Sequence, residues 1–86
     1  MEIKVGRVSH YYDRIGVAVL DLSGELKVGD TILILGRTTE FTQQVVSMEI
    51  EHQKVQSVGP GMEVALRVAE PVHKGDTVFK AIENTA

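Results

Sequence analysis

Two segments of this chain alternate regularly between apolar and polar residues. In residues 62–70 apolar side chains occupy every second position, with Glu63 and Arg67 between them. Residues 46–51 alternate in the same way. Because successive side chains of a strand point to opposite faces, each segment predicts a β-strand with one buried face.

Four further segments are short, rich in valine and isoleucine, and bounded by turn residues, which also predicts strands. They are residues 3–11, 15–22, 31–35 and 77–82. Segments 15–22 and 31–35 are apolar on both faces, so we expect these strands to be buried more deeply or to cross the corner of a barrel. Residues 53–58 fit either a helical turn or a loop.

Glycine-containing turns separate these strands. Glycine tolerates the positive φ of tight turns, and an aspartate side chain accepts hydrogen bonds from nearby backbone amides. The turn residues that we expect to shape the fold are Gly24, Gly29, Asp30, Gly61, Gly75 and Asp76. Residues 26–32 resemble residues 72–78, and residues 58–64 follow the same scheme with methionine in place of aspartate. We interpret the similarity as a recurring turn and not as a duplicated function.

Six short strands in an open sheet would leave two unpaired edges, and closure into a barrel removes them. We therefore predict an all-β fold, a small closed six-stranded Greek-key β-barrel. The length of 86 residues leaves room for one domain, residues 1–86, with a core over roughly residues 3–82.

The composition narrows the classes of protein. Hydrophobic residues make up 43% and charged residues 24%, which is typical of a globular chain. The chain has no cysteine, so disulfides, thiolate catalysis and cysteine-based zinc sites are excluded. No signal peptide is visible, and no apolar run approaches the roughly 18 residues of a membrane span. We expect a cytoplasmic protein without a membrane partner.

No catalytic or cofactor motif is complete. Residues 24–31 nearly match a phosphate-binding loop, but Asp30 replaces the required lysine and a strand follows, so we expect no nucleotide. The histidines His10, His52 and His73 share no spacing that predicts a metal site. Ser9 and His10 are adjacent, and adjacent strand residues point apart. We therefore expect no enzyme activity, no cofactor and no metal.

A polar cluster in residues 7–14 is the main candidate for binding. Arginine contacts phosphate, and tyrosine or histidine stacks on bases, so this surface resembles a platform for single-stranded RNA. The candidate RNA-binding residues are Arg7, His10, Tyr11, Tyr12 and Arg14. The alternative is that one tyrosine packs into the end of the barrel and the charges are only solvated.

The distribution of charge limits where RNA could bind. The net charge is -3, and residues 40–86 carry all of it, with four basic and seven acidic residues. Residues 1–39 are balanced, with five of each. RNA should therefore contact the N-terminal hairpin and avoid the face of Glu49 and Glu51.

The order of the motifs resembles the second domain of translational GTPases such as elongation factor Tu. The matching segments are residues 5–8, 23–32, 46–50, 59–64 and 74–78. The resemblance implies a standalone translation elongation factor-like protein with a six-stranded closed barrel. In that family the barrel contacts ribosomal RNA and the aminoacyl end of tRNA. A similar barrel is appended to some collagenase-like peptidases.

The chain also departs from the family. It has no GTPase domain, and residues 19–24 match the family pattern only at Gly24. Residues 10–14 lack the glycine-rich form. We expect a non-catalytic binding module that contacts RNA or ribosome-associated factors of the translation apparatus. The alternative is a protein–protein interaction module that docks on a larger enzyme or associates with itself.

Overall fold

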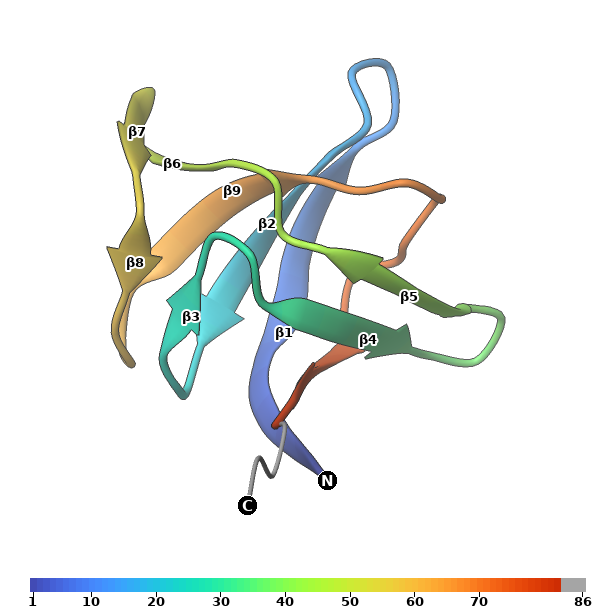
Figure 1. Ribbon diagram of the computed structural model, residues 1–86. Coiled ribbons are helices and arrows are strands. Elements are labelled where there is room, and N and C mark those ends of the chain that lie inside the picture. Colours follow the sequence, from blue (N-terminus) through green and yellow to red (C-terminus); the bar gives the residue numbers. More distant parts are fainter. Residues whose placement is uncertain (83–86) are drawn as a thin grey trace.

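The computed structural model describes residues 1–82. The regular secondary structure in these residues consists of β-strands alone (Figure 1). The strands are β1 (Glu2–Tyr12), β2 (Val17–Leu22), β3 (Leu26–Lys27), β4 (Thr31–Leu35), β5 (Glu40–Gln44), β6 (Met48–Ile50), β7 (Gln53–Val55), β8 (Ser57–Val58), β9 (Glu63–Arg67) and β10 (Thr77–Ala81). The predicted all-β fold is confirmed. No helix that could span a membrane occurs in this part of the chain.

Eight strands form one antiparallel sheet in the order β5-β4-β10-β1-β2-β9-β6-β7, and β3 pairs with β8 in a second, two-stranded sheet. Within residues 1–82, β5 and β7 end the large sheet and do not pair with each other. Strand pairing therefore does not close this sheet, and the predicted closed six-stranded barrel is not confirmed.

Two hydrogen bonds of one side chain connect β5 with the end of β9, where no strand ladder forms. In β5 the Gln43 amide donates from Nε2 to the carbonyl oxygen of Arg67 at 2.9 Å. Its Oε1 accepts from the backbone N–H of Ala69 at 2.6 Å. Just beyond β5, the N–H of Val45 donates to the carbonyl oxygen of Asp30 at 2.8 Å, which extends the β4–β5 pairing by one residue. The sheet therefore curls until β5 reaches the end of β9.

Strand β1 is the longest strand and contains two irregularities. It pairs with β10 on one side and β2 on the other, and its register shifts between Lys4 and Gly6 and again between Val8 and His10. The second shift leaves Ser9 outside the ladder, where its hydroxyl donates to the carbonyl oxygen of Val19 at 3.1 Å. A β-bulge of this kind reverses the alternation of faces beyond it.

The core is built from aliphatic side chains on the inner face of the sheet. Fully buried members include Leu20, Leu26, Ile32, Ile34 and Met48. Each such side chain contributes about 1.5–3 kcal/mol relative to an exposed one. Their alternation with outward residues explains why β2, β4 and β9 form strands with fixed register.

The recurring turn is confirmed at two places. Gly29 and Gly75 have φ angles of 98° and 95°. The carboxylate that follows each glycine accepts from a backbone N–H three residues back, Asp30 from Lys27 and Asp76 from His73, both at 2.9 Å. Gly61 also has a positive φ, of 86°, and Met62 there supplies no such cap. Gly24 differs, because it packs against Val5 and has no positive φ.

Several strand boundaries differ from the prediction because pairing distant in sequence determined them. Strand β5 was not predicted, since Phe41 is its only apolar residue. Residues 53–58 form β7 and β8, not a helical turn or a loop. Residues 46–51 were predicted as one strand, but β6 begins at Met48 and the side chain of Val46 is 67% exposed. Val45 is buried instead, where its backbone bonds to Asp30 and Gly29.

The two aspartate turns give a matched test of burial. Asp76 is buried and Asp30 is partly exposed. We expect Asp76→Ala to lower the free energy of unfolding by about 1–3 kcal/mol, because it leaves the His73 N–H without its partner in a part-buried turn. Asp30→Ala should cost about 1 kcal/mol or less, since water replaces the lost acceptor. Urea unfolding followed by circular dichroism measures the free energy of unfolding of both variants. Equal losses of stability would contradict the claim that burial makes the Asp76 cap the more important one.

Candidate functional site

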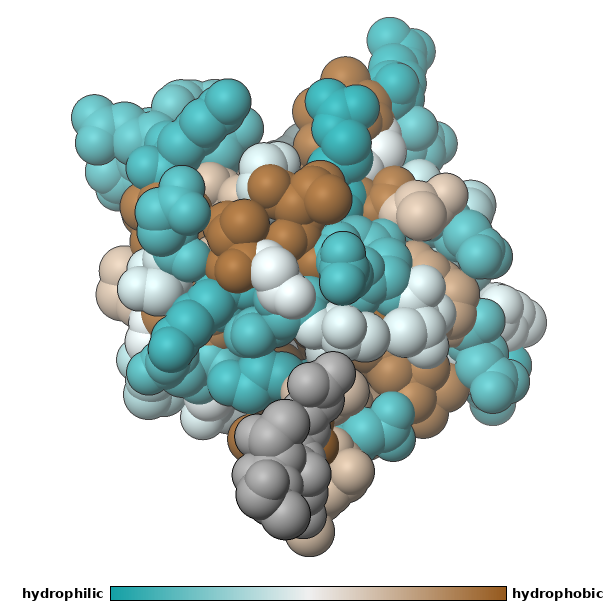
Figure 2. Space-filling view, in the orientation of Figure 1, coloured by the Kyte–Doolittle hydropathy of each residue, from teal (hydrophilic) through white to brown (hydrophobic). Residues whose placement is uncertain are grey.

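An open groove of about 490 Å³ crosses the outer face of β2 and β9, between the β1–β2 turn and the β6–β7 hairpin. Figure 2, which has the orientation of Figure 1, shows two projecting lobes that carry polar side chains, with hydrophobic surface between them. The residues that line the groove are Tyr12, Ile15, Val17, Val19, Glu49, Glu51, His52, Glu63, Val64 and Ala65. It is a surface feature formed by neighbouring strands and not an internal cavity.

The floor of the groove is apolar because β2 carries apolar residues on both of its faces. Val17 and Val19 point outward and remain half-buried, while Ala18 and Leu20 fill the core. Val19 lies opposite Ala65 of β9 in the antiparallel register. Outward positions of a solvated sheet face are usually polar, so this part of the face is unusual.

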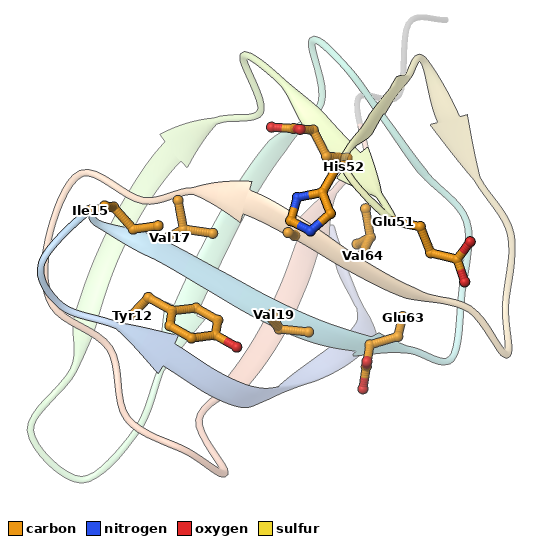
Figure 3. A pocket seen from close by; sticks show the side chains of 10 residues that line it. Tyr12, Ile15, Val17, Val19, Glu51, His52, Glu63 and Val64 are labelled. Carbon is orange, nitrogen blue, oxygen red and sulfur yellow. The ribbon is translucent and has the colours of Figure 1, made fainter.

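The groove has an acidic rim. Glu49, Glu51 and Glu63 line it and are exposed, and no lysine or arginine lines it. None of these three glutamates takes part in the ion pairs found in residues 1–82. In Figure 3 Glu51 and Glu63 lie toward one end, while Ile15 and Val17 lie toward the other.

One wall of the groove is a tight hairpin turn with an unfavourable backbone conformation. Glu51 and His52 connect β6 to β7 and have φ angles of 50° and 66°. Two-residue turns with positive φ at both positions favour asparagine followed by glycine. In Figure 3 the His52 imidazole and the Tyr12 ring extend toward the groove from its two sides.

The structure separates the candidate residues of the N-terminal cluster. The bulge at Ser9 places His10 and Tyr12 on the outer face, with ring centroids 4.3 Å apart and planes at 58°. Tyr11 points inward and packs against the core. Arg7 is exposed opposite Asp21, and Arg14 is exposed in the turn after β1. Tyr12 is the one member of the cluster that lines the groove.

The acidic and histidine members of the groove were not predicted as site residues. Glu49 and Glu51 were interpreted as the solvated side of a strand, and His52 as an isolated histidine. Their positions depend on a tight turn made of Glu51 and His52. These two residues match no sequence motif that predicts such a turn. The available signal was residues 15–22, where apolar residues on both faces mark the strand that forms the groove floor.

A second hollow of about 470 Å³ lies between the β4–β5 turn and the turn before β10. It contains His73, whose Nδ1 lies 3.1 Å from the Thr39 hydroxyl and 3.8 Å from Asp76 Oδ2. A nucleophilic triad needs the two ring nitrogens to contact different partners, whereas here one nitrogen faces both. Thr39 is also buried. These side chains hold the turn together, and among residues 1–82 no cluster of three metal-binding side chains occurs.

Comparison with known proteins gives relatives among proteases. The chain is 40% identical over 79 residues to an uncharacterized protease of Methanocaldococcus jannaschii. The matched region covers 91% of this chain and 19% of that protein. It is also 36% identical over 81 residues to a collagenase of Porphyromonas gingivalis, and this match covers 92% of the chain and 20% of that protein. The chain thus spans about a fifth of the length of these curated relatives. No family model matches the chain.

Two solved structures of a U32 peptidase domain share this fold. The C-terminal domain of a U32 peptidase from Geobacillus thermoleovorans superposes with a TM-score of 0.85 at 21% identity, over 91% of each chain. Its selenomethionine variant gives a TM-score of 0.84 at 20% identity, over 88% of this chain and 96% of that one. At this level of identity the likeness shows a shared fold.

The resemblance to elongation factor Tu and the translational GTPases is therefore wrong, and so is the standalone translation factor that it implied. The relatives are proteases and collagenases, and the matching structures are peptidase domains. These relatives give no support to an RNA-binding role for residues 7–14, which stays a prediction. In the structure Tyr11 packs against the core, and His10 and Tyr12 lie on the outer face.

The β6–β7 turn provides a test of backbone strain. Replacing Glu51 by Asn and His52 by Gly installs the pair that tolerates positive φ at both positions. We expect the double variant to raise the free energy of unfolding by about 1 kcal/mol, because the left-handed conformation no longer opposes a bulky side chain. Urea unfolding measures the change, with Glu49→Asn in the adjacent strand as the control. A loss of stability in the double variant would show that the turn is not strained.

Proposed function

We propose that this chain is a non-catalytic protein-binding domain that works with a U32-type peptidase, either within the same polypeptide or docked on it. The observation that carries the proposal is the exposed groove, whose apolar floor and acidic rim fit a protein surface. The fold shared with a U32 peptidase C-terminal domain and the identity with parts of proteases point to the class of partner. This proposal corresponds to the alternative given in the sequence analysis, a protein–protein interaction module that docks on a larger enzyme.

The chemistry of the described residues supports a binding role over a catalytic one. The Ser9 hydroxyl is held by the carbonyl oxygen of Val19, and Thr39 is buried beside His73. Nucleophilic catalysis needs an accessible nucleophile with a base that a third group orients. A binding surface needs only shape, exposed apolar area and a charge pattern, and the groove has all three.

The proposal is tested with a U32 peptidase from which its own C-terminal domain has been deleted. We expect this chain to form a one-to-one complex with it, with a Kd of about 1–100 μM by isothermal titration calorimetry, since the groove is small. The chain alone should release no dye from labelled gelatin. Hydrolysis of gelatin by the chain alone would contradict the non-catalytic role. The absence of a complex even at low ionic strength would contradict the choice of a U32 peptidase as the partner.

A further inference from the structure

We propose that the groove binds an extended peptide segment in which an apolar side chain lies beside a lysine or arginine. This inference rests on the proposed function as a protein-binding domain and specifies what the partner presents. The apolar side chain would lie over Val17, Val19 and Ala65, and the cation between Glu51 and Glu63.

The size and lining of the groove fit a short peptide. Its volume of about 490 Å³ falls within the range of about 300–1,000 Å³ that is typical of ligand sites. Tyr12 and Ile15 extend the apolar floor and remain 49% and 60% exposed. Apolar surface of this kind, rimmed by polar residues, marks interaction sites.

The charge pattern favours a basic partner over a second copy of this chain. Three glutamates surround the floor, and no lysine or arginine lines the groove. Two copies that met through this face would bring their glutamates together, and like charges at an interface oppose association. A lysine or arginine of a different protein relieves this repulsion.

The pattern also places the cation at one end of the groove. Glu49 pairs in register with Lys54 and shares a small neighbouring hollow with Lys54 and Arg67. Positive charge is therefore already present beside Glu49. The lining that Glu51 and Glu63 share contains no lysine or arginine, so the cation of the partner belongs at their end.

The Glu51–His52 turn holds this acidic wall in place. A two-residue hairpin turn fixes both side chains relative to β6 and β7, and strained backbone is concentrated at binding sites. Binding then requires little ordering of the wall, which lowers the entropic cost of association. The double replacement by Asn and Gly described above removes the Glu51 carboxylate from this wall, so it should stabilise the fold and weaken binding.

Three fluorescein-labelled nonapeptides test the chemistry of the groove. The first alternates leucine and lysine, the second replaces lysine by glutamate, and the third replaces leucine by serine. Fluorescence anisotropy at low salt should give binding of the first that is about tenfold or more tighter than that of either control. Amide shifts in NMR spectra should change at Val17, Val19 and Ala65. Equal binding of all three peptides, or shifts confined to another face, would overturn the proposal.

Two matched pairs of variants locate the contacts. Glu51→Gln with Glu63→Gln should weaken binding of the leucine–lysine peptide about fivefold, whereas Glu2→Gln with Glu40→Gln, which changes the net charge equally, should not. Val19→Thr removes apolar floor at constant shape and should weaken binding severalfold, whereas Val46→Thr, exposed outside the groove, should not. Circular dichroism confirms that each variant is folded.

The outcomes separate this inference from the proposed function. If the groove variants leave peptide binding unchanged while the chain still binds the truncated peptidase, the groove assignment is wrong and the protein-binding function stands. If sedimentation shows a dimer that Val19→Thr disrupts, a second copy occupies the groove and the peptide is overturned. If the peptide binds as expected and the peptidase does not, the groove assignment stands and the choice of partner is wrong.

Discussion

Strand β1 is the element on which the rest of this structure depends. It hydrogen bonds to β2 and β10, so it joins segments from both ends of the chain. Its bulge at Ser9 then decides which side chains enter the core. Without the bulge, strict alternation from Val8 would bury His10 and Tyr12 and expose Tyr11. With it, Tyr11 packs inside while Tyr12 forms one side of the groove. One unpaired residue thus couples core packing to the surface chemistry.

The sequence predicted those parts of the fold that local chemistry determines. The turns at Gly29 and Gly75 form as expected, because the glycine conformation and the aspartate cap lie within a few residues of each other. Strand β5 was not predicted because its sequence is mostly polar. It is held by pairing with β4 and by the contacts of Gln43 to the end of β9, which lies far away in the sequence. A polar residue such as Gln43 carries no local signal that it will replace a strand ladder.

The same local turns explain why the functional prediction went wrong. An aspartate that accepts from the backbone three residues earlier stabilises any strand entry of this shape, whatever the protein does. The order of such turns therefore reports the path of the chain and little about its partner. The groove depends instead on residues far apart in sequence, Val19 and Glu63 among them, which only the β2–β9 register brings together.

The positions of Met1 and Ile82 relative to the groove bear on the proposed function. The N–H of Ile82 donates to the carbonyl oxygen of Met1 at 2.7 Å, so these two residues lie side by side. In Figure 1 they lie at the end of the molecule opposite the β1–β2 turn and the β6–β7 hairpin, which flank the groove. A covalent connection at either residue would therefore leave the groove open. In the proposed function, a connection at this end and a peptide in the groove would therefore be separated by the length of β1.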